Sequence, residues 1–301
     1  MAGIHCGDRD TLAVLANSEG RILGRGLSKL RFNNPAEPEE WLPAVEQALE
    51  EACISAGCSS AVPDLAWIGI SGLGRRDGHE LETYFQRGQL GRVSVHVSSE
   101  ADLVLAAGVS QGWGVAISAG ATSMVVATNP EGIATKAGGW GSLFGENGSA
   151  FAVGMLAVQA LTRSLDGRAG LTLLVDGIMQ HWNIKTAGEL YHKVYLENIT
   201  QADFVDLVDI VLNAARDGDV AARAILHKTA DDLACLTSAV ATRLELPSKF
   251  PCALYGSILT GNSPIRKILL EELIKKGFMP DPILEVKEPV LGAVRLAISN
   301  L

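Results

Sequence analysis

Two stretches of the sequence, 112 residues apart, share one pattern. Residues 11–20 (TLAVLANSEG) and 123–132 (SMVVATNPEG) each place an apolar run before an Asn-x-Glu-Gly turn, and each follows an earlier strand and a short turn. Asn and Gly tolerate positive φ, so these residues between apolar runs are typical of a β-hairpin. A repeat with a period close to the length of a domain favours duplication of a fold unit. Two unrelated hairpins with common turn residues would give the same pattern.

The segment between the two hairpins alternates helix and strand. Residues 39–56 carry apolar side chains at helical spacing with acids on the other face, and a short helix is expected near residues 80–87. Residues 65–71 form a continuous apolar run, and residues 93–97 alternate as a strand does. Two serines then cap a helix from about residue 100 to residue 108. This order predicts an α/β fold with a mixed sheet.

The second half of the chain is richer in helix. Apolar runs predict strands over residues 251–257 and 283–286, and a proline near its start marks a last helix over residues 288–297. The other helices expected after the second hairpin cover residues 150–166, 186–197, 201–217, 221–244 and 264–276. The alternation of strands and helices extends the α/β prediction to the whole chain.

Composition and charge exclude several classes of partner. With 48% hydrophobic and 20% charged residues, the chain of 301 residues is long enough for two compact domains. A net charge of −9 repels polyphosphate backbones, so no nucleic-acid partner is expected. No apolar run reaches the ~20 residues of a membrane span and a signal-peptide layout is missing, which predicts no membrane partner and a cytoplasmic location. The five cysteines are expected to be free structural thiols.

Residues 115–151 are the candidate binding site. Two apolar strands there are joined by the turn AGATS, and a glycine-rich run follows and opens a helix. Runs of Gly, Ala, Ser and Thr leave backbone N–H groups accessible, and a helix N-terminus supplies more of them. Anions and sugar hydroxyl groups can therefore approach the main chain at this place.

Several motifs follow one another in an informative order. A Ser-Gly-x-Gly strand end begins at Ser71, the run AGGWGSLFGENGS covers residues 137–149, a Gly-Ser strand end lies at residues 256–257, and Pro-x-x-Gly-Ala covers residues 289–293. Together these motifs resemble the N-acetylglucosamine kinase and BadF-type ATPase family, of the sugar kinase, actin and Hsp70 superfamily. The resemblance covers essentially the whole chain, and residues 137–149 are its most specific part.

The resemblance implies an α/β fold with two RNase-H-like (actin-like ATPase) domains around a central cleft. The expected domains are residues 1–112 and residues 113–301, the second with extra helices. The last helix, about residues 290–301, is expected to pack back on the first domain. A small-molecule sugar and a nucleotide would bind in the cleft, with ATP and Mg²⁺ as cofactors, and a homodimer is expected because related kinases are often dimers.

The first hairpin departs from the family pattern. Relatives read roughly D-G-G-G-T-K-T there, with the Asp anchoring hydrated Mg²⁺, whereas this chain reads HCGDRDT from His5 onward. Imidazole is a poor partner for an oxygen-seeking cation, and His5 in its apolar run is expected to be a core histidine. The metal would then depend on Asp8 and Asp10, from a shifted register. These two acids and the arginine between them could equally form an exposed hairpin tip with no role.

The resemblance also assigns residues to phosphate. Arg9 stands in for the phosphate-binding Lys of relatives, since its planar fork suits phosphate oxygens. The other residues expected on the nucleotide and its phosphates come from three turns and are Gly7, Thr11, Gly120, Thr122, Ser123, Gly256 and Ser257.

Glu100 is the expected catalytic base. Relatives carry Asn-Asp before the cleft helix, the Asp taking the proton of the attacking sugar hydroxyl, and this chain carries Ser99-Glu100. The residues expected on the sugar are Asn34, Ser71, Gly139, Trp140 and Glu146. Each also has a simpler interpretation: Glu100 suits the helix dipole, Trp140 packs, Asn34 makes a turn before proline, and Glu146 is a solvated loop acid.

Three functions follow from these residues. The first is ATP-dependent phosphorylation of an amino sugar, an N-acetylglucosamine- or glucosamine-like hexose. The second is a kinase-fold protein that has lost phosphoryl transfer and serves as a sugar-binding or regulatory module, or performs other chemistry in the same cleft. The third, a dehydratase-activating ATPase, needs cysteines that bridge an iron–sulfur cluster, and the five cysteines are not placed for it.

Overall fold

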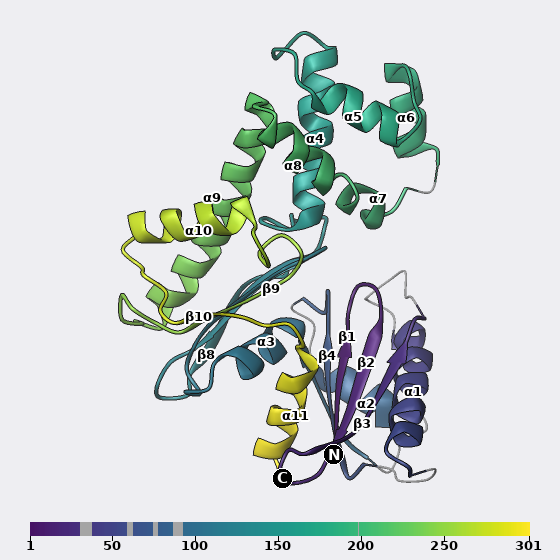
Figure 1. The fold of residues 1–301 in the computed structure, drawn as a ribbon, viewed down its shortest axis with the longest axis vertical. Coiled ribbons are helices and arrows are strands. Elements are labelled where there is room, and N and C mark those ends of the chain that lie inside the picture. Colours follow the sequence, from purple (N-terminus) through teal and green to yellow (C-terminus); the bar gives the residue numbers. More distant parts are fainter. Residues whose placement is uncertain (31–37, 59–62, 75–77, 87–92, 198) are drawn as a thin grey trace.

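The computed structural model describes residues 1–30, 38–58, 63–74, 78–86, 93–197 and 199–301, and it contains two five-stranded mixed sheets (Figure 1). The first sheet has the order β3-β2-β1-β4-β5 and comprises β1 (Ala2–Cys6), β2 (Thr11–Ala16), β3 (Ile22–Ser28), β4 (Leu65–Ile70) and β5 (Ser94–Ser99). The second has the order β10-β9-β6-β7-β8 and comprises β6 (Gly114–Ala119), β7 (Ser123–Thr128), β8 (Ala134–Gly138), β9 (Cys252–Tyr255) and β10 (Ile283–Glu285).

The two sheets are built alike. In each, three antiparallel strands come first, and the first of them then pairs in parallel with a later strand, which pairs in parallel with the last. Parallel pairing needs long crossovers, and these are the helical segments of the sequence. The predicted α/β fold with two RNase-H-like units is confirmed.

The hairpin repeat also holds at the level of single hydrogen bonds. Shifting β2 by 112 positions gives the bounds of β7. Gly20 and Gly132 have φ values of 80° and 83° in the two turns. In each turn an Asn side chain accepts the backbone N–H four residues on, at 2.8 Å for both Asn17 and Asn129. The chain therefore folds the two copies with the same turn chemistry.

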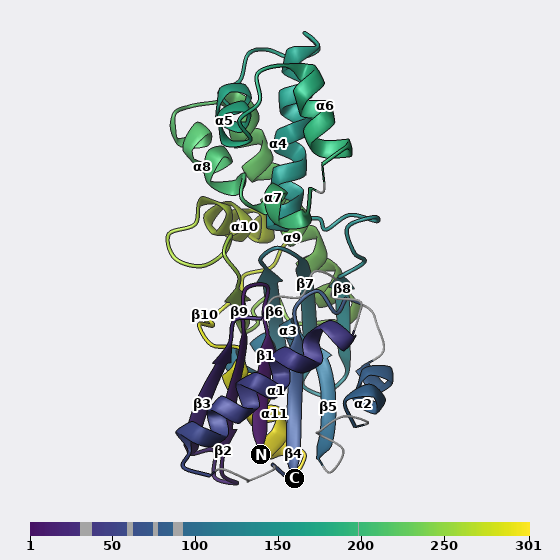
Figure 2. The same ribbon diagram turned by 90° about the vertical axis from the view of Figure 1, so that its right-hand side faces the viewer.

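Helices cover both faces of the first sheet. On one face, α1 (Pro38–Ser55) packs on β2 and β3, as Figure 2 shows, and α2 (Gly78–Gln86) packs beside β5. On the other, α11 (Val290–Ser299) packs on β1, β2, β4 and α3 (Glu100–Gly108). The C-terminal helix thus follows the last strand of the second sheet and lies on the first sheet (Figure 1).

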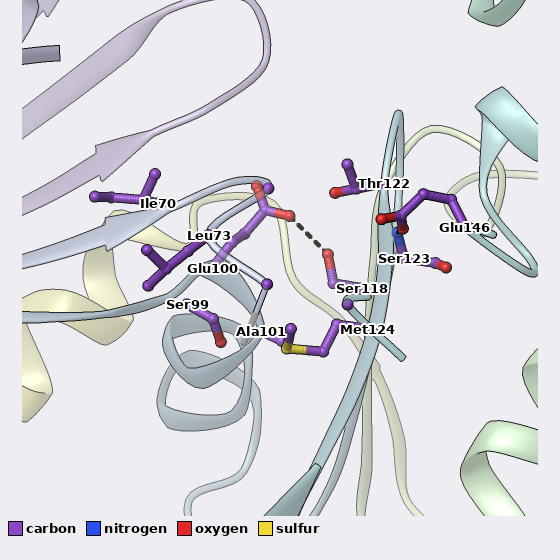
Figure 3. Close-up of a pocket in the computed structure, with 13 residues that line it drawn as sticks. Ile70, Leu73, Ser99, Glu100, Ala101, Ser118, Thr122, Ser123, Met124 and Glu146 are labelled. Carbon is purple, nitrogen blue, oxygen red and sulfur yellow. Dashed lines mark hydrogen bonds between the residues drawn. The ribbon is translucent and has the colours of Figure 1, made fainter. Parts of the chain in front are cut away.

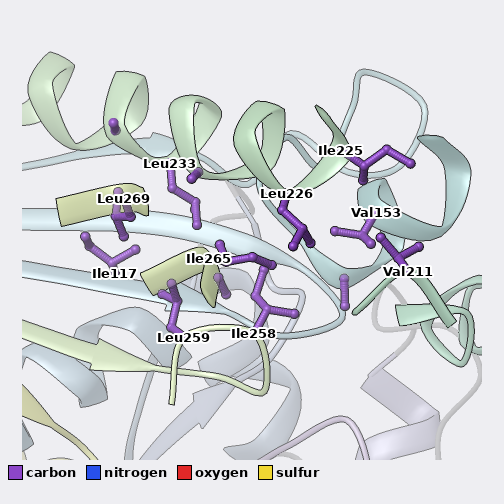
Figure 4. Packing of buried hydrophobic residues seen from close by; sticks show 14 of the residues in the cluster. Ile117, Val153, Val211, Ile225, Leu226, Leu233, Ile258, Leu259, Ile265 and Leu269 are labelled. Atoms are coloured by element: carbon purple, nitrogen blue, oxygen red, sulfur yellow. The ribbon is translucent and has the colours of Figure 1, made fainter. Parts of the chain in front are cut away.

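The second sheet carries a large helical layer on one side. Buried apolar side chains of these helices meet the sheet in one core, where for example Leu233 and Leu269 pack with Ile117 of β6 (Figure 4). The helices of this layer are α4 (Ala150–Leu165), α5 (Leu174–His181), α6 (Ala187–Tyr195), α7 (Gln201–Val205), α8 (Val208–Arg216), α9 (Val220–Arg243) and α10 (Pro264–Lys275). None of the helices in the described part of the chain has the length and apolar character needed to cross a bilayer.

Two helical expectations were wrong in detail. The segment 201–217 is not one helix but two, α7 and α8, and α5 was not expected. The ring of Phe204 meets Phe151 and Trp182 edge-on, with centroids 5.5 and 5.9 Å away. This ring is buried near the end of α7, and tertiary contacts of this kind can override the helical period of a sequence.

Candidate active site

Two turns meet between the sheets: the turn between β1 and β2, here called the first tip, and the turn between β6 and β7, here called the second tip. Asp8 lies at the tip between β1 and β2, and its Oδ2 accepts the N–H of Ala121, at the tip between β6 and β7, at 3.4 Å. The hydroxyl of Ser71 donates to Oδ1 of Asp8 at 2.6 Å. The tips therefore face each other, and one carboxylate lies between them.

Glu100 begins helix α3 directly after β5. Ser99 caps the helix in a capping box with Asp102, which fixes where the helix starts. Glu100 is 9% exposed, and His5 Nε2 lies 2.8 Å from its Oε1. The Ser118 hydroxyl donates to Oε2 at 2.6 Å (Figure 3). His5 belongs to the first sheet and Ser118 to the second, so the acid is held from both sides.

A pocket opens at Glu100 between the two sheets. Its walls come from the ends of β4 and β6, the start of α3, and the segments around residues 122 and 139. The lining residues are Ile70, Gly72, Leu73, Gly74, Ser99, Glu100, Ala101, Ser118, Thr122, Ser123, Met124, Gly139 and Glu146. Several residues expected on phosphate or sugar thus line one pocket with the expected base, and Figure 3 shows Thr122, Ser123 and Glu146 across from Glu100.

The electrostatics of this cleft are dominated by acids. Asp8 is an exposed residue, but protein atoms surround its carboxyl group. Loss of hydration is the larger cause that raises the pKa of this carboxyl group, and repulsion from Glu100 is the second. The hydrogen bond from Ser71 lowers the pKa and opposes the rise. Burial raises the pKa of Tyr255 above its ordinary value, and the carboxylates of Glu100, Asp8 and Asp10 raise it further. Three acidic side chains therefore act on one phenol at the end of β9.

The sugar-side residues lie on the opposite wall. Glu146 is 4% exposed, its Oε2 accepts the N–H of Ser123 at 2.9 Å, and burial raises its pKa. Gly139 is buried and Trp140, 59% exposed, lies next to it. The hydroxyl of Ser71 is directed at Asp8 rather than at this wall. The fifth expected sugar residue, Asn34, lies outside the described residues.

The phosphate-side residues divide into two groups. Arg9 and Asp10 are exposed on the first tip, and Gly7 is buried. Thr11 is completely buried at the start of β2, beside the thiol of Cys6, so the structure gives its hydroxyl no access to the cleft. The glycines and hydroxyl residues of the second tip, in contrast, line the pocket or lie at its edge.

Gly256 connects β9 to the second tip. Its φ is +107°, and a Cβ at this residue would lie 2.1 Å from the carbonyl oxygen of Ala119. A residue with a side chain is excluded by this approach as well as by the backbone conformation. The turn after β9 is therefore pressed against the end of β6, where the second tip begins, and Ser257 follows directly.

A second pocket lies beyond Ser257, between α8, α9 and the start of α10. Its polar lining includes Arg216, Arg223, His227 and Asn262. Apolar side chains from the three helices, and Ile258 from the turn after β9, complete it; the helical ones are Leu212, Leu226, Ile265 and Ile268. The cavity has a volume of about 650 Å³ and a mixed polar and apolar lining, which is within the range of small-molecule sites.

Comparison with known sequences decides the family. The family model described as the BadF/BadG/BcrA/BcrD ATPase family matches residues 2–297. The chain belongs to this ATPase family. The expected resemblance is thereby confirmed over nearly the whole chain.

Named relatives of this ATPase family member are sugar kinases. An N-acetylmuramic acid/N-acetylglucosamine kinase of Clostridium acetobutylicum is 26% identical over 251 residues, 83% of this chain and 81% of that protein. An N-acetyl-D-glucosamine kinase of Dictyostelium discoideum is 25% identical, covering 99% of this chain and 97% of that protein. A solved structure of a candidate N-acetylglucosamine kinase from Chromobacterium violaceum has a TM-score of 0.75 at 23% identity, covering 99% of this chain and 98% of that one.

A divalent cation, usual for ATPases, fits the donor chemistry at Asp8. Mg²⁺ prefers carboxylate oxygens and is commonly held by one or two of them together with water and substrate phosphates. Asp8 Oδ2 meets Ala121 only at the long distance of 3.4 Å, and the repulsion from Glu100 would be relieved by a cation. Among the described residues, no group of three or more His, Cys, Asp or Glu side chains is arranged as a metal site. Phosphate and water would therefore supply the remaining ligands.

Sequence reasoning missed two partners of Glu100. His5 was expected to be a core histidine, and it is buried, but its ring nitrogen contacts the acid. Ser118 ends an apolar strand inside the candidate stretch 115–151 without being singled out. The serine in an otherwise apolar strand was the sequence signal that could have pointed to Ser118. No sequence pattern pointed to Arg216 and His227, which line the second pocket.

Proposed function

We propose that this ATPase family member transfers the γ-phosphoryl group of ATP to a hydroxyl group of an amino sugar of the N-acetylglucosamine type. One observation carries the proposal: the buried carboxylate of Glu100 lines a narrow pocket of about 20 Å³ between the two sheets, beside the point where the two tips meet. The names of the two similar kinases support the sugar class.

Glu100 would act as the general base. A hydroxyl group of the sugar, bound within hydrogen-bonding distance, gives its proton to the carboxylate as its oxygen forms a bond to the γ-phosphorus. The bond from that phosphorus to the β,γ-bridging oxygen breaks, and ADP leaves. Burial between the sheets keeps water, the competing acceptor, away from the reaction.

The phosphates would lie along the two tips. The N–H groups of Gly120 and Ser123 already donate within the protein, to the Thr122 carbonyl and the Glu146 carboxylate. The N–H and hydroxyl groups of Thr122 and the guanidinium of Arg9 would therefore provide the donors, and the turn at Gly256 completes the cradle. Asp8, with Asp10 beside it, would hold Mg²⁺, which when bound offsets the charge of the phosphates. The nucleoside would occupy the pocket that begins at Ser257.

The sugar would bind on the remaining wall. Glu146 offers a carboxylate, Gly139 main-chain groups and Trp140 an aromatic face at the rim. Ser71 and Asn34 complete the proposed set. We assign residues 1–112 and 113–301 to two domains, the last helix packing on the first, and we place the reaction in the cytoplasm because ATP is its cosubstrate.

One observation favours a second candidate function. The Asp8 carboxylate accepts the N–H of Ala121, which belongs to the turn expected to hold phosphate. A carboxylate there repels a phosphate unless a cation lies between them. A sugar-binding or regulatory module that has lost phosphoryl transfer would show this arrangement with no need for a cation.

The deciding experiment measures ADP release with a panel of hexoses and N-acetylhexosamines in the presence of Mg²⁺ and ATP. We expect release that depends on an amino sugar and a loss of about 10²–10⁴-fold in Glu100→Gln, the usual range for a lost general base. Glu131→Gln, in the exposed turn between β7 and β8, is the control. Calorimetric sugar binding without ADP release and without binding of ATP at millimolar concentration would instead establish the second candidate.

A further inference from the structure

We propose that His5 and Ser118 are positioning residues that together fix the catalytic carboxylate of Glu100, one from each sheet. The inference rests on the proposed function, because it concerns how the base of that reaction is held. It assigns a role to two residues that sequence reasoning did not connect with Glu100.

Glu100 has a long side chain that needs fixing. A glutamate side chain has several rotatable bonds, and ordering them costs conformational entropy that contacts must offset. His5 Nε2 lies 2.8 Å from Oε1, and the Ser118 hydroxyl lies 2.6 Å from Oε2. A carboxylate only accepts hydrogen bonds, so Nε2 carries the proton and both partners donate. Each oxygen of the base is thus oriented by its own donor.

The two donors are themselves buried. His5 is 6% exposed in β1, its ring meets that of Tyr255 edge-on with centroids 6.0 Å apart, and Gly7 leaves space for it, since a Cβ there would lie 3.3 Å from the ring. Ser118 is 4% exposed in β6. A base whose supports are locked by packing keeps its geometry within the tolerance that proton transfer requires.

The supports come from different sheets. β1 belongs to the first sheet and β6 to the second, and Glu100 itself follows β5 of the first. The Ser118 hydrogen bond forms only while the two sheets keep their relative placement at the cleft, whereas the His5 contact lies within the first half. The base is therefore complete only in this arrangement of the two halves, which couples its geometry to the arrangement of the cleft.

The test measures kcat and KM of sugar-dependent ADP release. His5→Leu should lower kcat by about 10²-fold, the effect expected for a misplacement of about 1 Å, with both KM values within about threefold of the wild type. His5→Gln, whose amide can donate from a similar place, should recover most of the loss. Ser118→Ala should lower kcat by about tenfold, since one donor remains. His181→Gln, on the exposed end of α5, is the matched control.

A purely structural role would give a different pattern. When Glu100→Gln is already present, adding His5→Leu should leave the rate within about twofold of that of Glu100→Gln alone. The effects of two substitutions that act through the same group are not additive. Calorimetric sugar binding by each variant reports on folding, and Ser118→Ala and His5→Gln carry the test should His5→Leu fail to fold. Unchanged kcat in active variants, a change confined to KM, or an undiminished effect without Glu100 would overturn the inference alone. A wild-type protein without sugar-dependent ADP release would overturn the proposed function and the inference together.

Discussion

Replacing Gly256 by alanine tests whether the turn after β9 sets the position of the second hairpin tip. The new Cβ would lie 2.1 Å from the carbonyl oxygen of Ala119, and such contacts are essentially never shorter than 3.0 Å. Something must therefore move by about 0.9 Å, and the nearest atoms belong to the Ala119–Gly120 peptide, where the tip begins. A shift of about 1 Å near a reaction centre costs about 10²-fold in rate.

Gly132→Ala is the matched control, because this glycine has φ +83° but nothing within 4 Å of the added Cβ. Both alanine variants meet the cost of an unfavourable backbone conformation, about 1–3 kcal/mol. Only Gly256→Ala adds the clash, which should destabilise the protein by about 1–3 kcal/mol more. The free energy of unfolding, measured with urea, gives this difference.

The decisive measurement is kcat of sugar-dependent ADP release in the two variants. We expect Gly256→Ala to lose about 10²-fold and Gly132→Ala to stay within about twofold of the wild type, since its turn lies at the other end of β7. Equal kcat values for the two variants, together with equal unfolding free energies, would refute the claim that the Gly256 turn positions the tip.

Three further predictions concern the acids and the aromatic side chain of the cleft. The raised pKa of Asp8 means that the folded protein holds a proton there more tightly than the unfolded chain does, so stability falls as pH rises from about 3.8 through the folded pKa. Asp8→Asn should therefore melt at a higher temperature than the wild type at pH 7, and the difference should shrink toward pH 4. The increase should exceed that of Asp10→Asn. Mg²⁺ should raise the melting temperature of the wild type more than that of Asp8→Asn. Glu146→Gln should raise KM for the sugar by about tenfold or more, because hydrogen bonds to a charged group contribute about 1.5–3 kcal/mol; an unchanged KM would remove Glu146 from the sugar site. Trp140→Ala should raise that KM by up to about tenfold with kcat unchanged, and a loss confined to kcat would contradict its placement at the rim.

The sequence predicted the repeated strands β2 and β7 correctly, although the strands that follow them, β3 and β8, were not named. The Asn-x-Glu-Gly turns determine their own hydrogen bonds, so the shift of 112 residues placed β7 correctly on β2. The division between α7 and α8 depends instead on the ring of Phe204, which packs against residues distant in the chain. Local turn chemistry can be read from a sequence, whereas a bend that a distant contact selects cannot.

The candidate site shows the same division. Glu100 was found through the family resemblance, because the local pattern of an acid at the start of a capped helix also fits the helix dipole alone. The structure puts it in the pocket with Thr122, Ser123 and Glu146. Its contact with Ser118 joins residues from two sheets, which no local pattern specifies. The individual roles of these residues remain predictions for the experiments above.

The two departures from the family pattern at His5 and Glu100 are in contact with each other in the structure. The family resemblance implies Asp at the places of His5 and Glu100, and two carboxylates facing each other across a poorly hydrated cleft repel unless a cation separates them. In this chain an imidazole has replaced one acid and the other has gained a methylene, and the two groups hydrogen-bond at 2.8 Å. A donor and an acceptor satisfy each other without a cation, so the position of the base no longer depends on metal. A cation held by Asp8 would then act on the phosphates of the nucleotide. The dependence of kcat on Mg²⁺ should therefore arise from nucleotide binding rather than from the geometry of Glu100.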